Sequence, residues 1–192
     1  MILQTQRLLL RPWCETDRAP LAAITSDART MRFFGMVRGG AQSDAWMDRT
    51  QAHIDRHGFG IWAVEADGEG LIGFVGLSTI PDYLPVTPGV ELVWTLGAAW
   101  WGKGYAPEAA REAAADGFDR LSVAEIQAFT AAVNAPSRRV MEKIGMVHDP
   151  MASFDHPRIP RGNVLSRHVL YRLSNGVQGA AAPCRVQGGA LA

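Results

Sequence analysis

The stretch GVELVWTLGAAWWGKGYAPEAAREAAADGF, from Gly89 to Phe118, decides how this chain folds. Its apolar opening, GVELVWTLG, predicts a strand, and small and apolar residues recur at helical spacing from Pro107 onward. Pro107 suits the first turn of a helix, where its missing N–H costs nothing. Gly102 and Gly104 stand between these two segments. The stretch therefore predicts a strand, a tight glycine turn and a helix that ends near Leu121.

A strand, a glycine turn and a helix in this order bring backbone N–H groups together at a helix N-terminus. That end carries about half a positive charge and can hold a phosphate without a formal cation. Neither common nucleotide loop matches, because Gly104 follows Lys103 where a Walker loop has Ser or Thr, and Pro107 replaces the third glycine of a dinucleotide fingerprint. On the two glycines alone, an ordinary strand-to-helix turn is favoured, and a phosphate cradle is the alternative.

Outward from this stretch the chain alternates between expected strands and helices. Further strands are predicted at residues 7–13, 60–66, 70–80, 124–133 and 164–173, and those at 60–66 and 70–80 form a hairpin. Further helices are predicted after a cap at Thr16 or Asp17, from a cap at Ser43 to Gly58, and over residues 136–145. We expect a single domain over residues 1–173 and a flexible Gly- and Ala-rich tail over 174–192.

Composition excludes several classes of partner. A hydrophobic content of 47% is ample for a core, and 19 basic residues balance 19 acidic ones, so neither nucleic acid nor an acidic membrane surface is an expected partner. No basic leader or long apolar run is present, which predicts a cytoplasmic protein. Cys14 and Cys184 lack metal-ligand spacing, so we expect neither a disulfide framework nor a metal site.

The opening stretch, taken with VNAPSRRVMEKIGM at residues 133–146, resembles the GNAT N-acetyltransferase superfamily. The closest likeness is to its RimJ/RimL-like branch of ribosomal-protein-alanine acetyltransferases. The pyrophosphate loop of that superfamily reads Gln/Arg-x-x-Gly-x-Gly/Ala, and here Trp101, Gly104 and Ala106 take its three defined positions. Trp101 departs from the usual polar residue. Because such a loop binds mainly through backbone N–H groups, this departure should reshape the rim without abolishing the site.

The resemblance extends from Gln6 to Leu173. It favours a phosphate cradle over an ordinary strand-to-helix turn at Gly102 and Gly104. It implies an α/β (α+β) GNAT fold, in which a mixed, mostly antiparallel central sheet is splayed at the coenzyme site and flanked by helices. It also implies an amine acceptor, either a protein N-terminus or a small molecule, and dimers are common in this branch.

Acetyl-CoA is the donor that the resemblance implies. Its pyrophosphate would lie on the loop amides, and its pantetheine arm would pair like an extra strand with the backbone of residues 94–96. Arg138 or Arg139 would meet the adenosine phosphates, although a solvated helix face explains both arginines equally well. The implied coenzyme-binding residues are Trp94, Thr95, Leu96, Trp101, Gly102, Lys103, Gly104, Tyr105, Ala106, Asn134, Ser137, Arg138 and Arg139.

Acetyl transfer needs a neutral amine, a donor for the oxyanion and a proton for the departing thiolate. Glu91, at the start of the strand, is the candidate base, acting through water; the alternative is an exposed carboxylate at a strand edge. A backbone N–H near Trp94 would serve the oxyanion. Met141 stands where many members have a tyrosine and cannot donate a proton. Ser137, one helical turn earlier, matches the serine used in the RimL-like branch, so the resemblance implies Ser137 as the acid; the alternative is a residue that only orders the helix start or contacts pantetheine.

Two functions follow from these residues. The first is an N-acetyltransferase that acts by direct attack of a primary amine in a ternary complex. The second is a CoA-binding regulatory or catalytically degenerate module, which the loss of the tyrosine keeps open. Acceptor-site candidates are Asp155, His156, His168 and Tyr171, with Trp46, Phe33, Phe34 and Trp62 as aromatics for which core packing is the stronger interpretation.

Overall fold

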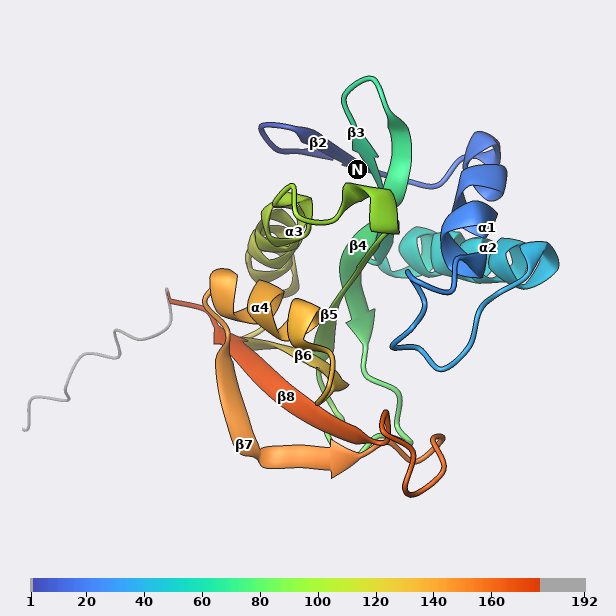
Figure 1. Ribbon diagram of the computed structural model, residues 1–192. Coiled ribbons are helices and arrows are strands. Elements are labelled where there is room, and N and C mark those ends of the chain that lie inside the picture. Colours follow the sequence, from blue (N-terminus) through green and yellow to red (C-terminus); the bar gives the residue numbers. More distant parts are fainter. Residues whose placement is uncertain (1, 177–192) are drawn as a thin grey trace, which may run out of the picture.

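The computed structural model describes residues 2–176 as a central sheet with helices on both faces (Figure 1). Its strands are β1 (Leu3–Gln4), β2 (Leu8–Arg11), β3 (Ile61–Ala66), β4 (Gly70–Thr79), β5 (Val90–Leu96), β6 (Glu125–Ala131), β7 (Val147–Asp155) and β8 (Arg167–Ser174). They form one eight-stranded sheet in the order β1-β2-β3-β4-β5-β6-β8-β7. Only β5 and β6 run parallel, so the expected mixed, mostly antiparallel sheet is confirmed.

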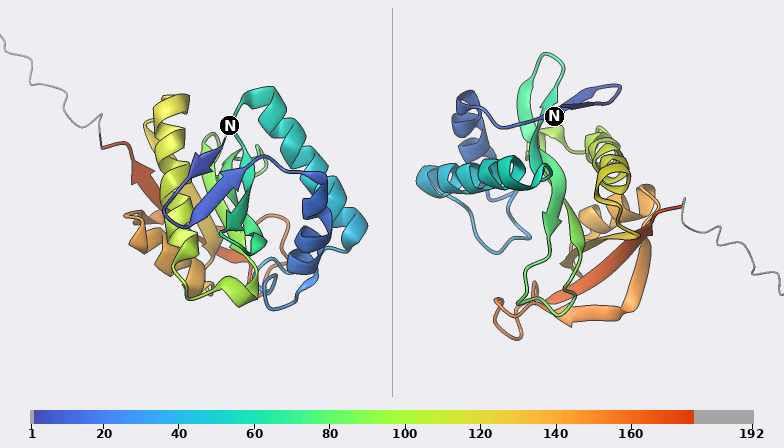
Figure 2. Two further views of the ribbon diagram at one scale, coloured as in Figure 1. Left: turned by 90° about the horizontal axis from the view of Figure 1, so that it is seen from above. Right: turned by 180° about the vertical axis from the view of Figure 1, so that it is seen from behind.

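The helices divide between the two faces of the sheet, as the two views in Figure 2 show. On one face lie α3 (Tyr105–Leu121) and α4 (Ala135–Lys143), and on the other lie α1 (Arg18–Ser26) and α2 (Gly40–His57). None of the helices within residues 2–176 is long and apolar enough to cross a bilayer. The flexible tail expected over 174–192 falls, from residue 177 on, outside the described residues; Ser174 still belongs to β8.

Apolar side chains fill both faces. The larger cluster packs the sheet against α3 and α4 and contains Trp62, Leu92, Ile126 and Tyr171. A second cluster lies under α1 and α2 and contains Trp13, Leu21, Met47 and Phe74. A third, smaller cluster contains Ile80 and Leu84, from the segment after β4, and Phe154 of β7.

One expected helix start is wrong. The helix predicted from a cap at Ser43 begins earlier, at Gly40, and the backbone N–H of Gly39 donates to the Gln42 side chain. Ser43 is buried instead, where its hydroxyl bonds the hydroxyl of Thr25 on α1 at 3.1 Å. The helix predicted with Pro107 in its first turn is confirmed, because α3 begins at Tyr105 and ends at Leu121.

The strand β7 was not expected. Pro150 interrupts its pattern, and its pairing with β8 shifts register between Asp149 and Phe154. Most of its side chains are exposed, because β7 is the last strand of the sheet. A strand of this kind lacks the apolar alternation by which strands are found in sequence.

The sheet opens between β5 and β6. Glu91 and Gln127 form the one register pair found between these strands among the described residues. Beyond that pair toward Leu96, the edge of β5 that faces β6 has no partner strand. Side chains of Leu92 and Leu96 point toward α3, so Glu91 and Thr95, by alternation, point toward the face covered by α1 and α2.

Candidate active site

The turn after β5 carries a row of free backbone donors. Gly102 and Gly104 have φ values of 78° and 81°, in the left-handed region where a side chain costs about 1–2 kcal/mol. None of the backbone N–H groups from Trp101 to Ala106 has a hydrogen-bond partner within residues 2–176. Because α3 begins at Tyr105 and is 17 residues long, these donors stand at the positive end of a helix dipole. The geometry is that of an anion cradle.

Residues far away in the sequence hold this turn in place. The Arg7 guanidinium donates to the carbonyl of Lys103 at 2.9 Å and pairs with Glu108 in the first turn of α3, with Nε to Oε2 at 2.8 Å. Glu108 also accepts from the hydroxyl of Thr5 at 2.6 Å. Although burial opposes its ionisation, the bonds from Thr5 and Arg7 hold the pKa of Glu108 below its ordinary value. Sequence analysis missed this clamp because its partners lie about a hundred residues apart.

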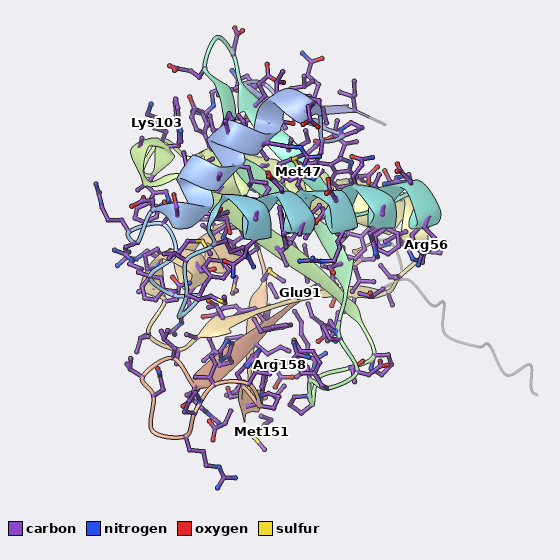
Figure 3. The ribbon with its side chains drawn as sticks, turned by 90° about the vertical axis from the view of Figure 1, so that its right-hand side faces the viewer. Met47, Arg56, Glu91, Lys103, Met151 and Arg158 are labelled. Carbon is purple, nitrogen blue, oxygen red and sulfur yellow. The ribbon has the colours of Figure 1, made fainter. Side chains whose placement is uncertain are left out.

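Trp101 has a structural role that explains its departure from the polar residue of the motif. Its indole N–H donates to the carbonyl of Leu96 at 2.7 Å and so closes the turn after β5. Arg32, from the segment between α1 and α2, lies over the same ring at 5.0 Å from the centroid. Lys103 instead packs its ammonium on Trp100 and lies on the outside of the turn (Figure 3). The free donors of this turn are therefore backbone N–H groups.

The open edge of β5 leads from this cradle toward Glu91. Two buried polar atoms along this path, the hydroxyl of Thr95 and the side-chain carbonyl of Gln127, lack a hydrogen-bond partner. Their residues are 6% and 8% exposed. Buried polar atoms are nearly always partnered, so these two mark where a ligand or water completes the structure. An unpaired strand edge that ends in an anion cradle fits an acyl-coenzyme A, with its amide-bearing arm and its pyrophosphate.

Asn134 and Ser137 follow β6 at the same end of the splay. The Asn134 side chain caps α4: its oxygen accepts from the N–H of Ser137 at 3.3 Å, and its nitrogen donates to the Thr130 hydroxyl at 2.8 Å. Arg138 turns back onto Tyr171 and the Ala132 carbonyl, each at 3.3 Å. Arg139 is exposed. The structure thus brings the loop after β5 and the start of α4 to one edge of the sheet.

Glu91 lies at the closed end of the splay. Its carboxyl has no ion pair or hydrogen bond within the described part of the chain, and burial raises its pKa to about 8. Figure 3 shows Glu91 below α2, between that helix and the loop that carries Arg158. Glu91 is partly buried, unlike the exposed strand-edge carboxylate of the alternative interpretation. A carboxyl that titrates near neutral pH is suited to general-base chemistry.

The remaining polar candidates are divided between the two faces. His168 is buried beside Phe154 and His156, with ring centroids 5.5 and 5.1 Å away, and burial lowers the pKa of both histidines. Tyr171 points to the opposite face, where it bonds Arg138 and Glu142. Asp155 is exposed and pairs with Arg167.

The aromatic candidates also separate. Trp62 lies in the core under α3, and Trp46 packs with Trp13 and Phe74 under α2. Phe33 stacks with Arg32, and Phe34 is 47% exposed. Within residues 2–176 no cluster of His, Cys, Asp and Glu is arranged to hold a metal ion.

Comparisons with known proteins found the following similarities. Residues 7–147 match the family model described as an acetyltransferase (GNAT) domain. The FsC-acetyl coenzyme A-N(2)-transacetylase of Aspergillus fumigatus is 29% identical over 155 residues, which cover 76% of this chain and 65% of that protein. The crystal structure of an acetyltransferase (GNAT family) from Bacillus anthracis superposes with a TM-score of 0.75 at 26% identity, covering 91% of this chain and 98% of that one.

A more distant likeness concerns the fold alone. RimL, a ribosomal L7/L12 alpha-N-protein acetyltransferase solved in complex with coenzyme A, superposes with a TM-score of 0.74 at 12% identity, over 91% of this chain and 98% of that one.

Proposed function

Because this chain belongs to the GNAT acetyltransferase family, we propose that it transfers the acetyl group of acetyl-CoA to a primary amine by direct attack in a ternary complex. The observation that carries this proposal is the row of unpartnered N–H groups from Trp101 to Ala106, which continues from the open edge of β5. The RimJ/RimL-like branch is the part of the family we assign, with a protein N-terminus or a small-molecule amine as acceptor.

In this proposal the coenzyme supplies the activated acetyl group, and the chain supplies its position. The loop amides hold the pyrophosphate, and the backbone of residues 94–96 pairs with the pantetheine amides. Asn134, although engaged as a cap, keeps an N–H and a lone pair for a further bond. Arg139 is the better placed of the two arginines for an adenosine phosphate, because Arg138 is held against Tyr171.

The chemistry then falls to a small number of groups. Glu91 takes a proton from the acceptor amine through water, and the amine nitrogen attacks the thioester carbon. A backbone N–H on the open edge of β5 donates to the oxyanion that forms. The C–S bond breaks as the new C–N bond is completed, and the Ser137 hydroxyl supplies the proton that the departing sulfur takes. Water relays the proton held by Glu91 to the serine alkoxide, which restores both side chains, so the net products are an amide and free CoA.

A catalytically degenerate, CoA-binding module is the second candidate. Met141, which stands where many members carry the acid tyrosine, is 1% exposed in the core, so no hydroxyl reaches the thiolate from that position. Release of CoA, measured with a panel of amines and peptides, separates the two candidates. Turnover that disappears in Glu91→Gln while acetyl-CoA binding persists supports the enzyme. Tight binding with no acceptor modified, in the wild-type protein, leaves only the module.

A further inference from the structure

Arg38, in the segment between α1 and α2, is a partly buried cation that no carboxylate within residues 2–176 neutralises. Its backbone N–H is fixed by a bond to the Thr25 carbonyl at 2.9 Å, and its guanidinium lies over Trp46 at 5.6 Å from the ring centroid. The guanidinium has no ion pair and no hydrogen bond within residues 2–176. Buried arginines are almost always paired, because their N–H donors lose water on burial.

The surroundings of this guanidinium are positive. Arg49 lies close enough to add to the effect of burial, and together they lower the pKa of Arg38. The nearby carboxylates of α2, Asp44 and Asp48, both turn to Arg18, at 3.7 and 2.9 Å. Among the described residues, Arg38 therefore has an aromatic surface and a second positive charge beside it, but no anion.

Arg38 belongs to the same face of the sheet as the candidate base. The ring of Trp46 lies 4.6 Å from that of Phe74, and Phe74 is the register partner of Thr95 on β5. Thr95 and Glu91 point to this face from the same strand. In Figure 3, α2 crosses this face above Glu91.

The segment that carries Arg38 also touches the coenzyme turn. The Thr30 hydroxyl accepts the N–H of Ala98 at 3.1 Å, and Arg32 covers Trp101. A ligand that reaches Glu91 between α2 and the coenzyme would pass this segment.

We propose that Arg38 and the Trp46 ring form a subsite for a carboxylate group of the acceptor, so that the favoured substrates are amines that also carry a carboxylate. The inference rests on the proposed function, since it names the substrate class of that site. A carboxylate can accept two parallel hydrogen bonds from the planar guanidinium, and the Trp46 ring beneath orients that guanidinium. The coenzyme phosphates have their own donors on the loop, at the N-terminus of α3.

Glycine, diglycine and triglycine, each compared with its C-terminal amide, test this subsite. The two members of a pair differ only in the carboxylate, and the three lengths vary its distance from the amine. At the best length we expect the carboxylate form to be preferred by about tenfold or more in kcat/KM. Arg38→Gln should abolish this preference, and the matched variant Arg49→Gln should keep it. A preference that is absent in the wild type, survives in Arg38→Gln or falls equally in both variants overturns the proposal.

Calorimetry provides a readout that does not need turnover. The same peptides, added to the protein with CoA bound, should bind more tightly than their amides to the wild type but not to Arg38→Gln. If no carboxylate of the series binds or reacts, the subsite is refuted. If the Kd for acetyl-CoA rises in Arg38→Gln, the arginine serves the coenzyme and the proposal is wrong. Carboxylate binding through Arg38, with no member of the wider panel of amines and peptides acetylated, would refute the proposed function and leave the carboxylate-binding subsite standing.

Discussion

The titration of Glu91 predicts how activity and stability depend on pH. Burial raises the pKa of this carboxyl from 4.5 to about 8. Between these two values the folded protein holds a proton that the unfolded chain has released. The free energy of unfolding therefore falls as pH rises from about 4.5 to about 8, and is level above that range. Activity runs the other way, because a general base must be ionised.

The size of the stability effect follows from the same pKa. A proton held to pH 8 in place of 4.5 corresponds to about 5 kcal/mol as an upper limit. Because the side chain keeps some contact with solvent, we expect about 2–3 kcal/mol. Glu91→Gln introduces a neutral side chain of the same shape. Its free energy of unfolding should not decrease over this pH range and should exceed that of the wild type at pH 8–9. Urea denaturation of both proteins from pH 5 to 9 measures the difference.

Histidines do not confuse this measurement. Burial lowers the pKa of His53, His156 and His168, so their contribution to stability rises with pH and is complete above about pH 6.5. The decline between pH 6.5 and 8 therefore belongs to Glu91, and both proteins share the histidine contribution.

Kinetics supply the second half of the test. The kcat/KM of the wild type should rise toward a plateau above pH 8, measured with an acceptor whose amine titrates well away from that pH. Glu91→Gln should lower kcat/KM about a hundredfold or more, with little change in the Kd for acetyl-CoA. A plateau that begins near pH 5, or equal losses in kcat/KM and in coenzyme affinity, would refute the assignment of Glu91 as the base.

Three further variants test the remaining parts of the site. Gly104→Val places a branched side chain at positive φ inside the cradle and should raise the Kd for acetyl-CoA about tenfold or more. The control Gly68→Val, at a similar φ in the β3–β4 turn, should cost stability but leave that Kd unchanged. Equal Kd values for the two variants would remove the phosphate assignment. Trp101→Phe keeps a ring for Arg32 but loses the bond to Leu96, so about 1 kcal/mol of stability and a few-fold of coenzyme affinity should be lost in denaturation and binding experiments. Ser137→Ala should lower kcat by about three- to tenfold at constant Kd for acetyl-CoA, because a thiolate of ordinary pKa is a tolerable leaving group; a raised Kd with unchanged kcat would make the hydroxyl a binding group instead.

Sequence reasoning succeeded for the fold where all the causes are local. The strand, turn and helix from Val90 to Leu121 follow from apolar spacing, two glycines and one proline within a single stretch. It failed where the deciding contact is distant. Serine is a common helix cap, but the Ser43 hydroxyl is buried and hydrogen-bonded to the hydroxyl of Thr25 on α1. The strand β7 is found only through its pairing with β8, since its own pattern is exposed and broken by Pro150.

The candidate site shows the same limit. The glycine turn before α3 was predicted from its own neighbourhood, whereas the role of Asn134 as the cap of α4 was not predicted. The clamp of Arg7 on Glu108 and the anchoring of Trp101 to Leu96 need the fold, because nothing in the local sequence says which carbonyl or carboxylate will be near. Arg38 carries no signal in sequence at all, since its importance lies in the absence of a partner.

The groups that the protein leaves unsatisfied lie on one side of the sheet or at its open edge. The buried side-chain atoms without partners belong to His53, Thr95 and Gln127, all on the face covered by α1 and α2 within the described residues. Glu91 lies without a partner on this same face, beside Gln127. Under α3 and α4, by contrast, the Tyr171 hydroxyl has two partners. Each unpartnered group costs stability unless a ligand completes it. Acetyl-CoA and a carboxylate-bearing amine should therefore each raise the Tm, and together they should raise it more than either alone.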